Sequence, residues 1–393
     1  MAVITAELTD VQKEIVATVR DFVEKDVIPV ANELEHKDEY PAEIVQKMKD
    51  IGLFGLKIPE QYGGLGEPLT TYALVVVELA RGWMSLSGIL NTHFMAAWLL
   101  ENFGTEQQKE KFLPRMATGE VRAALSMSEP HAGSDTQAIR CKAIRDGDVY
   151  RVTGTKMWVT NGSRAGIVML MCKTDPEADP PRRGIGMLIV EKEPEVAKMP
   201  GLEVTPNIDK LGYKGLETTE LIFDDYPVPV ENLLGGEEGQ GFYQTMAGIE
   251  VGRVNVAARA IGVAQRAFEE AIRYAQERET FGRPIAQHQA IQFKLADMAT
   301  QLEAAKLLMM NAAQKKDRGE RTDLEAGMAK LFAAEMCMFV CTEALRIHGG
   351  YGYSKEFTVE RLYRDAPFFI IGEGTSEIQK RIIGRQLLDR YKI

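Results

Sequence analysis

Glu373 is the residue of this chain with the clearest catalytic potential. It stands between two glycines in a short break between helical patterns, shortly after the apolar run 368–371. Ser376 and Gln379 form a capping-box pattern, which predicts the start of the final helix just behind it. A carboxylate aimed from such a break into an apolar cavity loses hydration, which raises its pKa and strengthens it as a base near neutral pH. The competing interpretation is a solvated loop glutamate, the commoner fate of this residue type.

Three other segments, 126–135, 156–162 and 278–282, hold more glycine, hydroxyl and aromatic residues than packing requires. Glycine and small hydroxyl groups let a backbone approach a ligand closely and offer donors to it. Trp158 and Thr160 combine a flat ring with a hydroxyl, which suits a stacked aromatic cofactor. Arg278 could hold a pyrophosphate through two parallel hydrogen bonds. Taken singly, these features also fit a Ser/Gly turn, a core tryptophan and a solvated arginine at a helix end.

Several common enzyme classes lack their motifs in this chain. The sequence contains no G-x-G-x-x-G, no G-x-x-x-x-G-K-[ST], no G-x-S-x-G and no H-E-x-x-H. These absences argue against a doubly wound nicotinamide enzyme, a P-loop nucleotidase, a serine hydrolase and a zinc hydrolase. The five histidines and four cysteines form no complete set of ligands at metal-binding spacing, so we expect no metal site.

The bulk composition is that of a soluble globular protein. The 393 residues are 45% hydrophobic and 26% charged, and the length suits two or three packed regions. The net charge of −10 argues against a nucleic-acid partner. Four scattered cysteines favour a reducing compartment, the segment 1–10 lacks the pattern of a secretion signal, and no apolar stretch reaches about 18 residues. We therefore expect a cytoplasmic protein without membrane insertion.

The periodicity of apolar residues predicts a mainly α fold with a central β domain. Helical spacing dominates residues 1–120, with a capping box at Thr105 and Gln108, and it returns in 236–393. Residues 121–235 carry short β-rich runs and a hairpin signal at Asp146-Gly147, which suit an antiparallel barrel or sandwich. The expected strands are 148–153, 156–160, 166–172, 186–191 and 218–223. The expected C-terminal helices are 242–279, 287–318, 323–348 and 357–391, the last interrupted at 372–375, and they predict a four-helix bundle.

In this order the four segments 126–135, 156–162, 278–282 and 372–379 resemble those of the acyl-CoA dehydrogenases, and the resemblance covers nearly the whole chain. It implies FAD as cofactor, an acyl-CoA substrate, an electron-transfer flavoprotein as electron acceptor and a homotetramer. It also implies that Glu373 removes the α-proton of the thioester while the β-hydrogen leaves as hydride to the flavin. The backbone N–H of Glu373 and a flavin ribityl hydroxyl would polarise the thioester carbonyl.

The resemblance assigns further residues to the cofactor and the substrate. Ser128 would donate to the isoalloxazine edge, Trp158 would pack on the ring, and Thr160 would meet N5. Arg278 and its neighbours would reach the cofactor of an adjacent subunit. The cofactor set is Leu125, Met127, Ser128, Gly133, Ser134, Trp158, Val159, Thr160, Arg278, Thr280, Phe281, Gln289, Arg346, Ile347, Gly349, Gly350, Thr375 and Glu377. The substrate set is Ser134, Glu250, Arg253, Gly372 and Gly374.

Two positions bear on the base and on the acyl group. Some members of the family carry the base on the first bundle helix, where this chain has Gly252, and this supports Glu373. Arg253 matches a family arginine near the base, whereas Glu250 is better interpreted as a helix-face carboxylate. The residue before the base is often Tyr in members that take straight chains. Here it is Gly372, which predicts room for a short or branched acyl group.

Two alternatives remain open at this point. An oxidase of the same fold would pass electrons to dioxygen, and fast reoxidation of the reduced flavin by oxygen would reveal it. A bundle-based binding protein without catalysis would be colourless when purified. Intact Glu373, Trp158, Thr160 and Arg278 speak against the second alternative.

Overall fold

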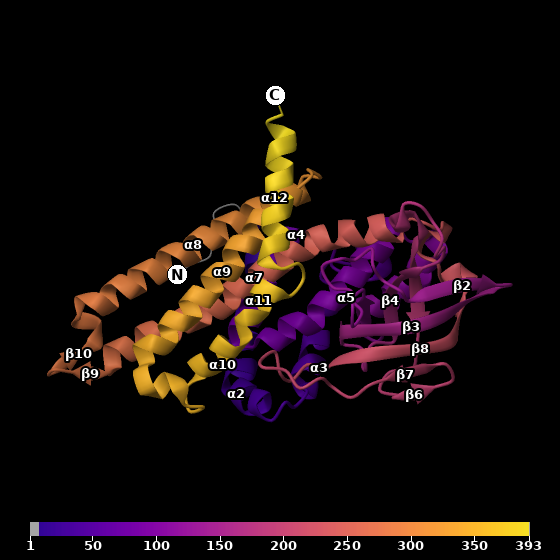
Figure 1. Ribbon diagram of the computed structural model, residues 1–393. Helices are drawn as coiled ribbons and strands as arrows, with labels where there is room; N and C mark the ends of the chain where they lie inside the picture. The colour runs from indigo at the N-terminus through magenta and orange to yellow at the C-terminus, as the bar shows by residue number, and fades with distance from the viewer. Residues whose placement is uncertain (1–7, 393) are drawn as a thin grey trace.

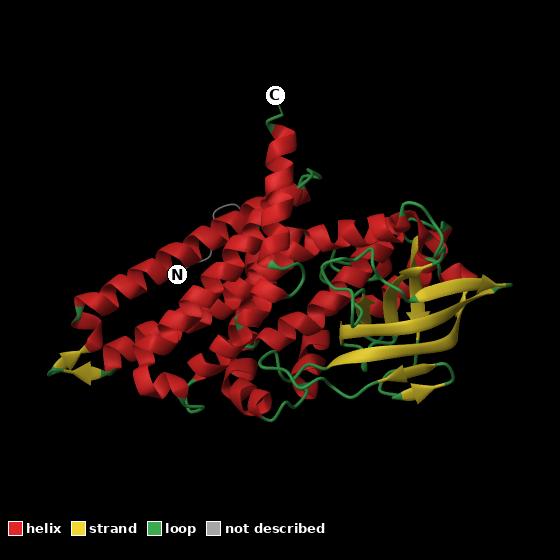
Figure 2. Cartoon of the chain, in the orientation of Figure 1, coloured by secondary structure: helices red, strands yellow, loops and turns green. Residues whose placement is uncertain are grey.

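The computed structural model describes residues 8–392, so most of the N-terminal segment considered for a secretion signal lies outside it. Its first part is helical (Figures 1 and 2). The helices are α1 (Asp10–Phe22), a π-helical turn (Val23–Val27), α2 (Ile28–His36), α3 (Ala42–Asp50), α4 (Leu69–Gly82), α5 (Met84–Phe103) and α6 (Glu106–Ala117). The capping box at Thr105 and Gln108 is confirmed at the start of α6. Helix α4 is buried on every side, which its nearly continuous apolar sequence explains.

The middle part is a twisted sheet at one end of the molecule (Figure 2). Its strands are β1 (Ala123–Ser126), β2 (Lys142–Asp146), β3 (Val149–Thr160), β4 (Ile167–Lys173), β5 (Ile185–Glu191), β6 (Lys198–Met199), β7 (Leu202–Val204) and β8 (Thr218–Pro229). They pair in the order β1-β4-β2-β3-β8-β7-β6, and β5 pairs with β4. The expected hairpin is confirmed, because β2 and β3 pair antiparallel across Gly147.

The sheet differs from the sequence prediction in two respects. It is not wholly antiparallel, since β4 runs parallel to β1 and to β2. The runs 148–153 and 156–160 form one continuous strand, β3, rather than two strands. Its register against β8 shifts between Val152 and Gly154 and again between Lys156 and Val159. Such bulges bend a strand without ending it and re-aim the side chains beside them.

The last part is again helical. It contains α7 (Gly241–Glu277), a small ribbon of β9 (Glu279–Thr280) and β10 (Arg283–Pro284), α8 (Gln289–Asp317), α9 (Asp323–His348), α10 (Thr358–Asp365), α11 (Pro367–Ile371) and α12 (Ser376–Arg390). The three long helices agree with the predicted ranges to within two residues at either end. The fourth predicted helix is broken twice, at Ala366, before Pro367, and again at 372–375, and α12 projects away from the body (Figure 1).

One apolar core joins the two helical parts. It includes residues of α1, α4 and α5 together with residues of α7, α8 and α9. Helix α7 lies at the centre and crosses α4 closely at Gly262, where a Cβ atom would come 2.3 Å from the carbonyl oxygen of Val77. Helix α7, which carries several candidate site residues, is therefore held between the N-terminal helices and the helices of the last part. The molecule is elongated, with the sheet at one end and the β9–β10 ribbon at the other (Figure 1).

The close crossing of α4 and α7 predicts a specific stability effect. Gly262→Ala should lower the free energy of unfolding by about 1–3 kcal/mol, because the new methyl group overlaps a backbone carbonyl. Gly384→Ala is the matched control, since Gly384 lies in α12 with no heavy atom within 4 Å of its added Cβ. That change should be neutral or stabilise by up to about 1 kcal/mol. Denaturant unfolding of both variants measures these free energies. Equal changes in the two variants would contradict a close contact between α4 and α7 at Gly262.

Candidate active site

Glu373 lies in the break between α11 and α12. Its backbone has φ of 53°, in the left-handed region that a residue with a side chain seldom adopts. Backbone strain of this kind persists where surrounding contacts impose it, and it is concentrated at functional sites. The predicted capping box at Ser376 is wrong by one residue. Thr375 is the N-cap of α12, and its hydroxyl accepts from the backbone N–H of Ile378.

The carboxylate of Glu373 is held by two helices. Its Oε1 accepts a hydrogen bond from Nδ2 of Asn91 in α5 at 3.0 Å and from Nη1 of Arg259 in α7 at 3.1 Å. Its Oε2 lies 3.7 Å from the point where a Cβ of Gly252 would be. The predicted apolar surroundings are therefore wrong in part, because both partners of the carboxylate are polar. Gly252, the position of the alternative base, does face Glu373.

Burial and charge act on Glu373 in opposite directions. Loss of hydration raises the pKa of its carboxyl group, while attraction to Arg259, the hydrogen bond from Asn91 and attraction to Lys330 lower it, and the net direction is upward. The side chain of Glu373 remains 29% exposed, whereas that of Arg259 is fully buried. The carboxylate thus has one open side and one side that faces a buried cation.

Lys330 holds the strained break in place. Its side chain, fully buried in α9, donates through Nζ to the carbonyl oxygens of Phe369 and Gly374, each at 2.6 Å. One of these carbonyls precedes Glu373 and the other follows it, so one ammonium group fixes both ends of the break. Burial lowers the pKa of Lys330 to about 8, which leaves it mostly protonated at neutral pH.

The two substrate candidates on α7, Glu250 and Arg253, have surroundings of their own. Arg253 is buried, and burial lowers its pKa. Among the described residues, the arginine that donates a hydrogen bond to the carboxylate of Glu373 is Arg259. Glu250 accepts hydrogen bonds from Lys316 and from the hydroxyl and backbone N–H of Thr322. Glu250 therefore connects α7 to the turn between α8 and α9. This agrees with its interpretation as a helix-face carboxylate rather than as a substrate contact.

Gly372 does not border an empty space. A Cβ added there would come within 2.8 Å of the ring of Phe368, although φ of −77° would allow a side chain. The space that the first carbon of a side chain at position 372 would take is thus occupied by the ring of Phe368.

The segments around Ser128 and Trp158 come together in the sheet. The backbone N–H of Met157 donates to the carbonyl of Ser128 at 2.9 Å. Beneath them, Nζ of the fully buried Lys156 donates to the carbonyl of Met127 and to Oε1 of Glu129, both at 2.8 Å. Trp158 has φ of 64° at the bulge in β3, and it is 55% exposed. The interpretation as a core tryptophan is therefore wrong, because the bulge turns this ring outward.

Asn161 connects this surface to the base. It follows β3 directly, and its Nδ2 donates to the carbonyl of Ile89 at 3.0 Å and to the hydroxyl of Thr92 at 2.5 Å, both in α5. The neighbouring residue of α5, Asn91, holds Glu373. One helix thus aligns the exposed face of Trp158 and Thr160 with the carboxylate.

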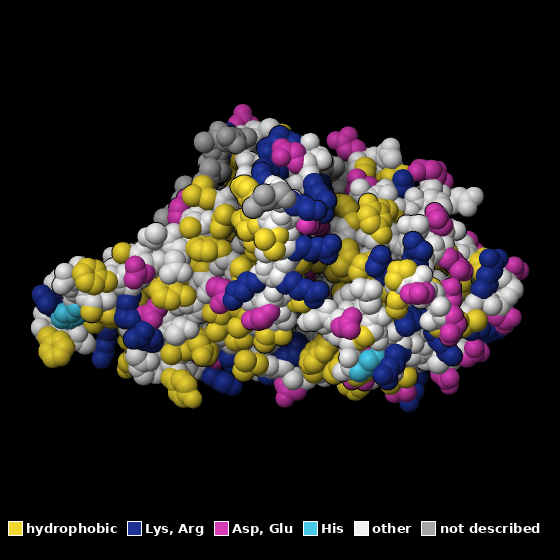
Figure 3. Space-filling view, turned by 45° about the horizontal axis from the view of Figure 1, so that its top comes forward, with side chains coloured by type: hydrophobic (Ala, Val, Ile, Leu, Met, Phe, Trp, Pro, Cys, Tyr) yellow, Lys and Arg dark blue, Asp and Glu magenta, His cyan; other side chains and the backbone are white. Residues whose placement is uncertain are grey.

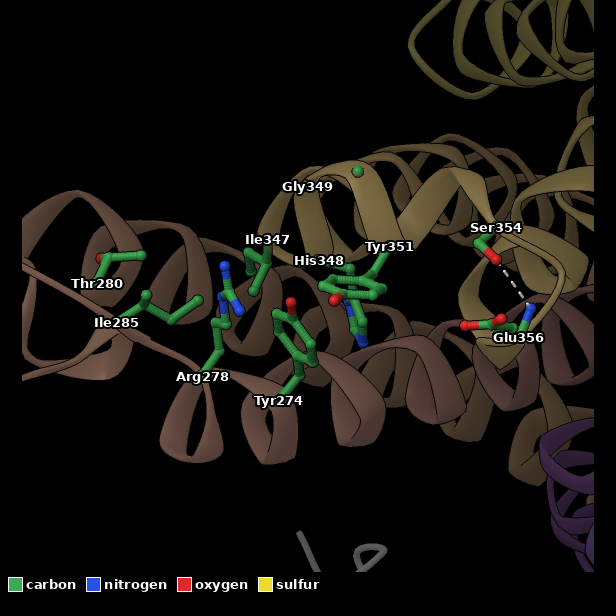
Figure 4. A pocket seen from close by; sticks show the side chains of 11 residues that line it. Tyr274, Arg278, Thr280, Ile285, Ile347, His348, Gly349, Tyr351, Ser354 and Glu356 are labelled. Atoms are coloured by element: carbon green, nitrogen blue, oxygen red, sulfur yellow. Dashed lines mark hydrogen bonds between the residues drawn. The ribbon is translucent and has the colours of Figure 1, made fainter.

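The second group of cofactor candidates lies elsewhere. Arg278, Thr280, Ile347, Gly349 and Gly350 line a pocket of about 630 Å³ at the turn after α9 (Figure 4). Arg278 points into it, and the ring of Tyr274 stacks on His348 with centroids 4.2 Å apart. This pocket adjoins the β9–β10 ribbon, at the opposite end of the molecule from β3 (Figure 1). Within one chain the two groups do not meet.

Comparison with known proteins settles the family. Models of the acyl-CoA dehydrogenase N-terminal, middle and C-terminal domains match residues 9–120, 124–226 and 239–388. An acyl-CoA dehydrogenase of Bacillus subtilis (strain 168) is 44% identical over 371 residues, which cover 94% of this chain and 96% of that protein. The chain belongs to the acyl-CoA dehydrogenase family. It is therefore an oxidoreductase.

Two further relatives of this acyl-CoA dehydrogenase family member bear on its chemistry. A subunit of the caffeyl-CoA reductase-Etf complex of Acetobacterium woodii is 42% identical over 377 residues, which cover 94% of this chain and 96% of that protein. The structure of butyryl-CoA dehydrogenase from Megasphaera elsdenii matches with a TM-score of 0.92 and 38% identity. That match covers 97% of this chain and 99% of the other. The helical, sheet and helical order is thus the fold of this family.

Sequence reasoning missed three residues that hold Glu373 and its backbone break in this family member, Asn91, Arg259 and Lys330. Two of them left a signal, because Arg259 and Lys330 are charged residues in runs rich in alanine within long helices. A charge at a buried position of this kind must have a partner, which marks it as structural or functional. Their partners could not be named, because they lie 39 to 114 residues away in the chain.

The two hydrogen bonds from Lys330 to the carbonyls of Phe369 and Gly374 predict that removing this lysine lowers activity as well as stability. Lys330→Met should lower kcat more than tenfold, because both carbonyls lose their partner and the break that carries Glu373 relaxes. The matched control is Lys306→Met, since Lys306 is also a buried bundle lysine but donates to Gln265. The control should lower stability and leave kcat within about twofold. Equal kcat losses in the two variants would contradict the role of Lys330 in fixing the break that carries Glu373.

The bond from Asn91 predicts a shift in pH dependence. On the acid side, kcat/KM should rise with pH as Glu373 loses its proton. Asn91→Leu removes a donor that favours the ionised form, so the midpoint of this limb should move upward by about one pH unit. Asn102→Leu, in the same helix but bonded only to the carbonyl of Trp98, is the control and should leave the midpoint in place. An unmoved or lowered midpoint for Asn91→Leu would refute the assignment.

Proposed function

We propose that the protein is an FAD-dependent dehydrogenase that converts a short or branched acyl-CoA to the trans-2-enoyl-CoA and passes electrons to an electron-transfer flavoprotein. The observation that carries this proposal is Glu373. Its carboxylate is partly open, has a raised pKa, and is held by hydrogen bonds from α5 and α7. A fixed base of raised pKa is what removal of a proton next to a thioester carbonyl requires.

The β surface fits the flavin ring. The exposed Trp158 at a strained bulge offers a flat contact, and the half-buried Thr160 and Ser128 offer hydroxyl donors beside it. Leu125, Met127 and Val159 would support this surface, and Gly133, with no heavy atom within 4 Å of an added Cβ, leaves space for a ligand. FAD, when bound, supplies the hydride acceptor of the reaction. The chain supplies the surface that orients it.

The distant pocket supports a role for a neighbouring subunit. The pocket at Arg278 and its flanks would hold the pyrophosphate end of a cofactor bound to another copy of the chain, because it cannot meet Trp158 of its own chain. The remaining residues of this group, Phe281, Gln289 and Arg346, are exposed. Apolar patches on the helical half of the molecule (Figure 3) favour the homotetramer. Phe293 and Leu307 of α8 and Leu388 of α12 are exposed large apolar side chains.

The chain's own groups would act on the substrate as follows. Glu373 takes the α-proton through its carboxylate, and its backbone N–H polarises the thioester carbonyl. Ser134, exposed after β1, would meet the phosphates of CoA, and Gly374 would leave the thioester room beside the base. Thr375 would act through the cap of α12 that fixes the break, and Glu377 is exposed in its first turn.

The direction of the reaction and the acceptor belong to the proposal. The relative from Acetobacterium woodii is named as a reductase in an Etf complex, which supports an electron-transfer flavoprotein as partner. By microscopic reversibility the same glutamate that removes the α-proton would return it in the reverse reaction. A flavin oxidase of this fold remains the second candidate. No described helix is long and apolar enough to cross a membrane, and four free buried cysteines favour the cytoplasm.

The base predicts the outcome of a conservative substitution. Glu373→Gln should reduce the rate at which acyl-CoA thioesters bleach the flavin by at least about 1000-fold, because an amide cannot take the proton. Glu101→Gln is a matched control, since Glu101 of α5 is another carboxyl whose pKa burial raises, but its charge partners are Lys57 and Lys109. Stopped-flow absorbance of the yellow holoenzyme without oxygen provides the measurement. Bleaching at the original rate in Glu373→Gln would refute the proposed function.

A further inference from the structure

Arg259 is a buried cation behind the base. It lies in α7, two helical turns after Gly252, and its side chain is fully buried. A guanidinium taken out of water loses much hydration energy, and it is stable there only when its charge and its N–H groups are compensated. Among the described residues its guanidinium donates through Nη1 to Glu373 and interacts with the hydroxyl of Tyr213, and these two contacts compensate it only in part.

One edge of this guanidinium has no partner. Within the described residues, neither Nε nor Nη2 of Arg259 makes a hydrogen bond. These two nitrogens lie on the same edge and point their N–H groups in parallel, which is the arrangement that matches the two oxygens of a carboxylate. The arginine–carboxylate pair between Arg364 and Glu35, which Nη1 and Nη2 form in this protein, shows the same two-pronged chemistry.

Aromatic rings fix the orientation of that edge. The guanidinium carbon of Arg259 lies 4.9 Å from the ring centroids of Tyr213 and of Phe368. Packing against two rings holds the plane of the group and satisfies its faces but not its edges. Phe368 is also the ring that fills the space beside Gly372, so the same side chain shapes the acyl site and orients the arginine.

Other polar atoms around the base also lack partners. The Oδ1 atoms of Asn91 and of Asn255 are buried and unbonded, and Asn255 donates through Nδ2 to the hydroxyl of Tyr72. The charges of Arg259 and Glu373 both act on the Tyr72 hydroxyl: Arg259 lowers its pKa and Glu373 raises it. A site built for a purely hydrocarbon chain has no use for these groups, since each costs about 1–3 kcal/mol when buried without a partner.

We infer that the acyl group carries a second, anionic end, and that Nε and Nη2 of Arg259 bind it. The substrate class is then the mono-CoA thioester of a short dicarboxylic acid. The acid must be short, because Arg259 directly contacts the base that acts on the α-carbon. The substrate carboxylate would also compensate the arginine when Glu373 takes up the proton and loses its own charge. This inference rests on the proposed function.

The test compares thioesters that differ only at the far end. For the holoenzyme, kcat/KM should be higher for glutaryl-CoA than for valeryl-CoA, or for methylsuccinyl-CoA than for 2-methylbutyryl-CoA, by about 100-fold, the value of a charge-assisted hydrogen-bonded pair. Each pair replaces a terminal methyl group by a carboxylate. Arg259→Gln should remove this preference, and Arg259→Lys, which keeps the charge without the planar edge, should retain only part of it.

The ratio separates binding of the far end from the strength of the base, because any change in Glu373 affects both members of a pair equally. Arg266→Gln is the control, since Arg266 is a buried arginine in the same helix that pairs with Glu270. It should leave the ratio unchanged. If the neutral thioesters bleach the flavin as fast as the dicarboxylic ones, the inference is overturned and the dehydrogenase function stands. If no thioester bleaches it, both are overturned.

Discussion

The arrangement of the site depends on holding one glutamate in a strained backbone break. Glu373 adopts a left-handed conformation, and three helices stabilise it there: α5 through Asn91, α7 through Arg259 and α9 through Lys330. Each partner is buried and comes from a different part of the chain. The fold therefore has to form around the base, and the shared core of α4, α5, α7 and α9 provides the rigidity that a fixed carboxylate needs.

The same helices connect the base to the sheet. Asn161 anchors the end of β3 to α5 next to Asn91, so the outward face of Trp158 keeps a fixed relation to the carboxylate. The buried pair of Lys156 and Glu129 binds the Ser128 segment to that strand. Polar groups buried between the sheet and the helices thus hold Trp158 and Glu373 in a fixed relation, which the proposed flavin chemistry needs.

Local patterns predicted much of this structure from the sequence. The long helices, the hairpin at Gly147 and the break at Glu373 all have signatures within a few residues, and they were found where expected. Long-range features were not predictable in this way. The exposure of Trp158 depends on a bulge set by pairing with β8, and the choice of Arg259 over Arg253 depends on which side of α7 faces the break. The ring of Phe368 lies where a side chain of residue 372 would begin, and no local pattern could place it there.

The most direct test of the account is a crystal structure of the holoprotein with an acyl-CoA analogue that cannot be dehydrogenated. The account predicts that the carboxylate of Glu373 lies within about 3.5 Å of the α-carbon, opposite a flavin ring packed on Trp158. Arg259 and Asn91 should still hold the carboxylate in that complex. A carboxylate turned away from the thioester, or a flavin bound away from Trp158, would contradict it.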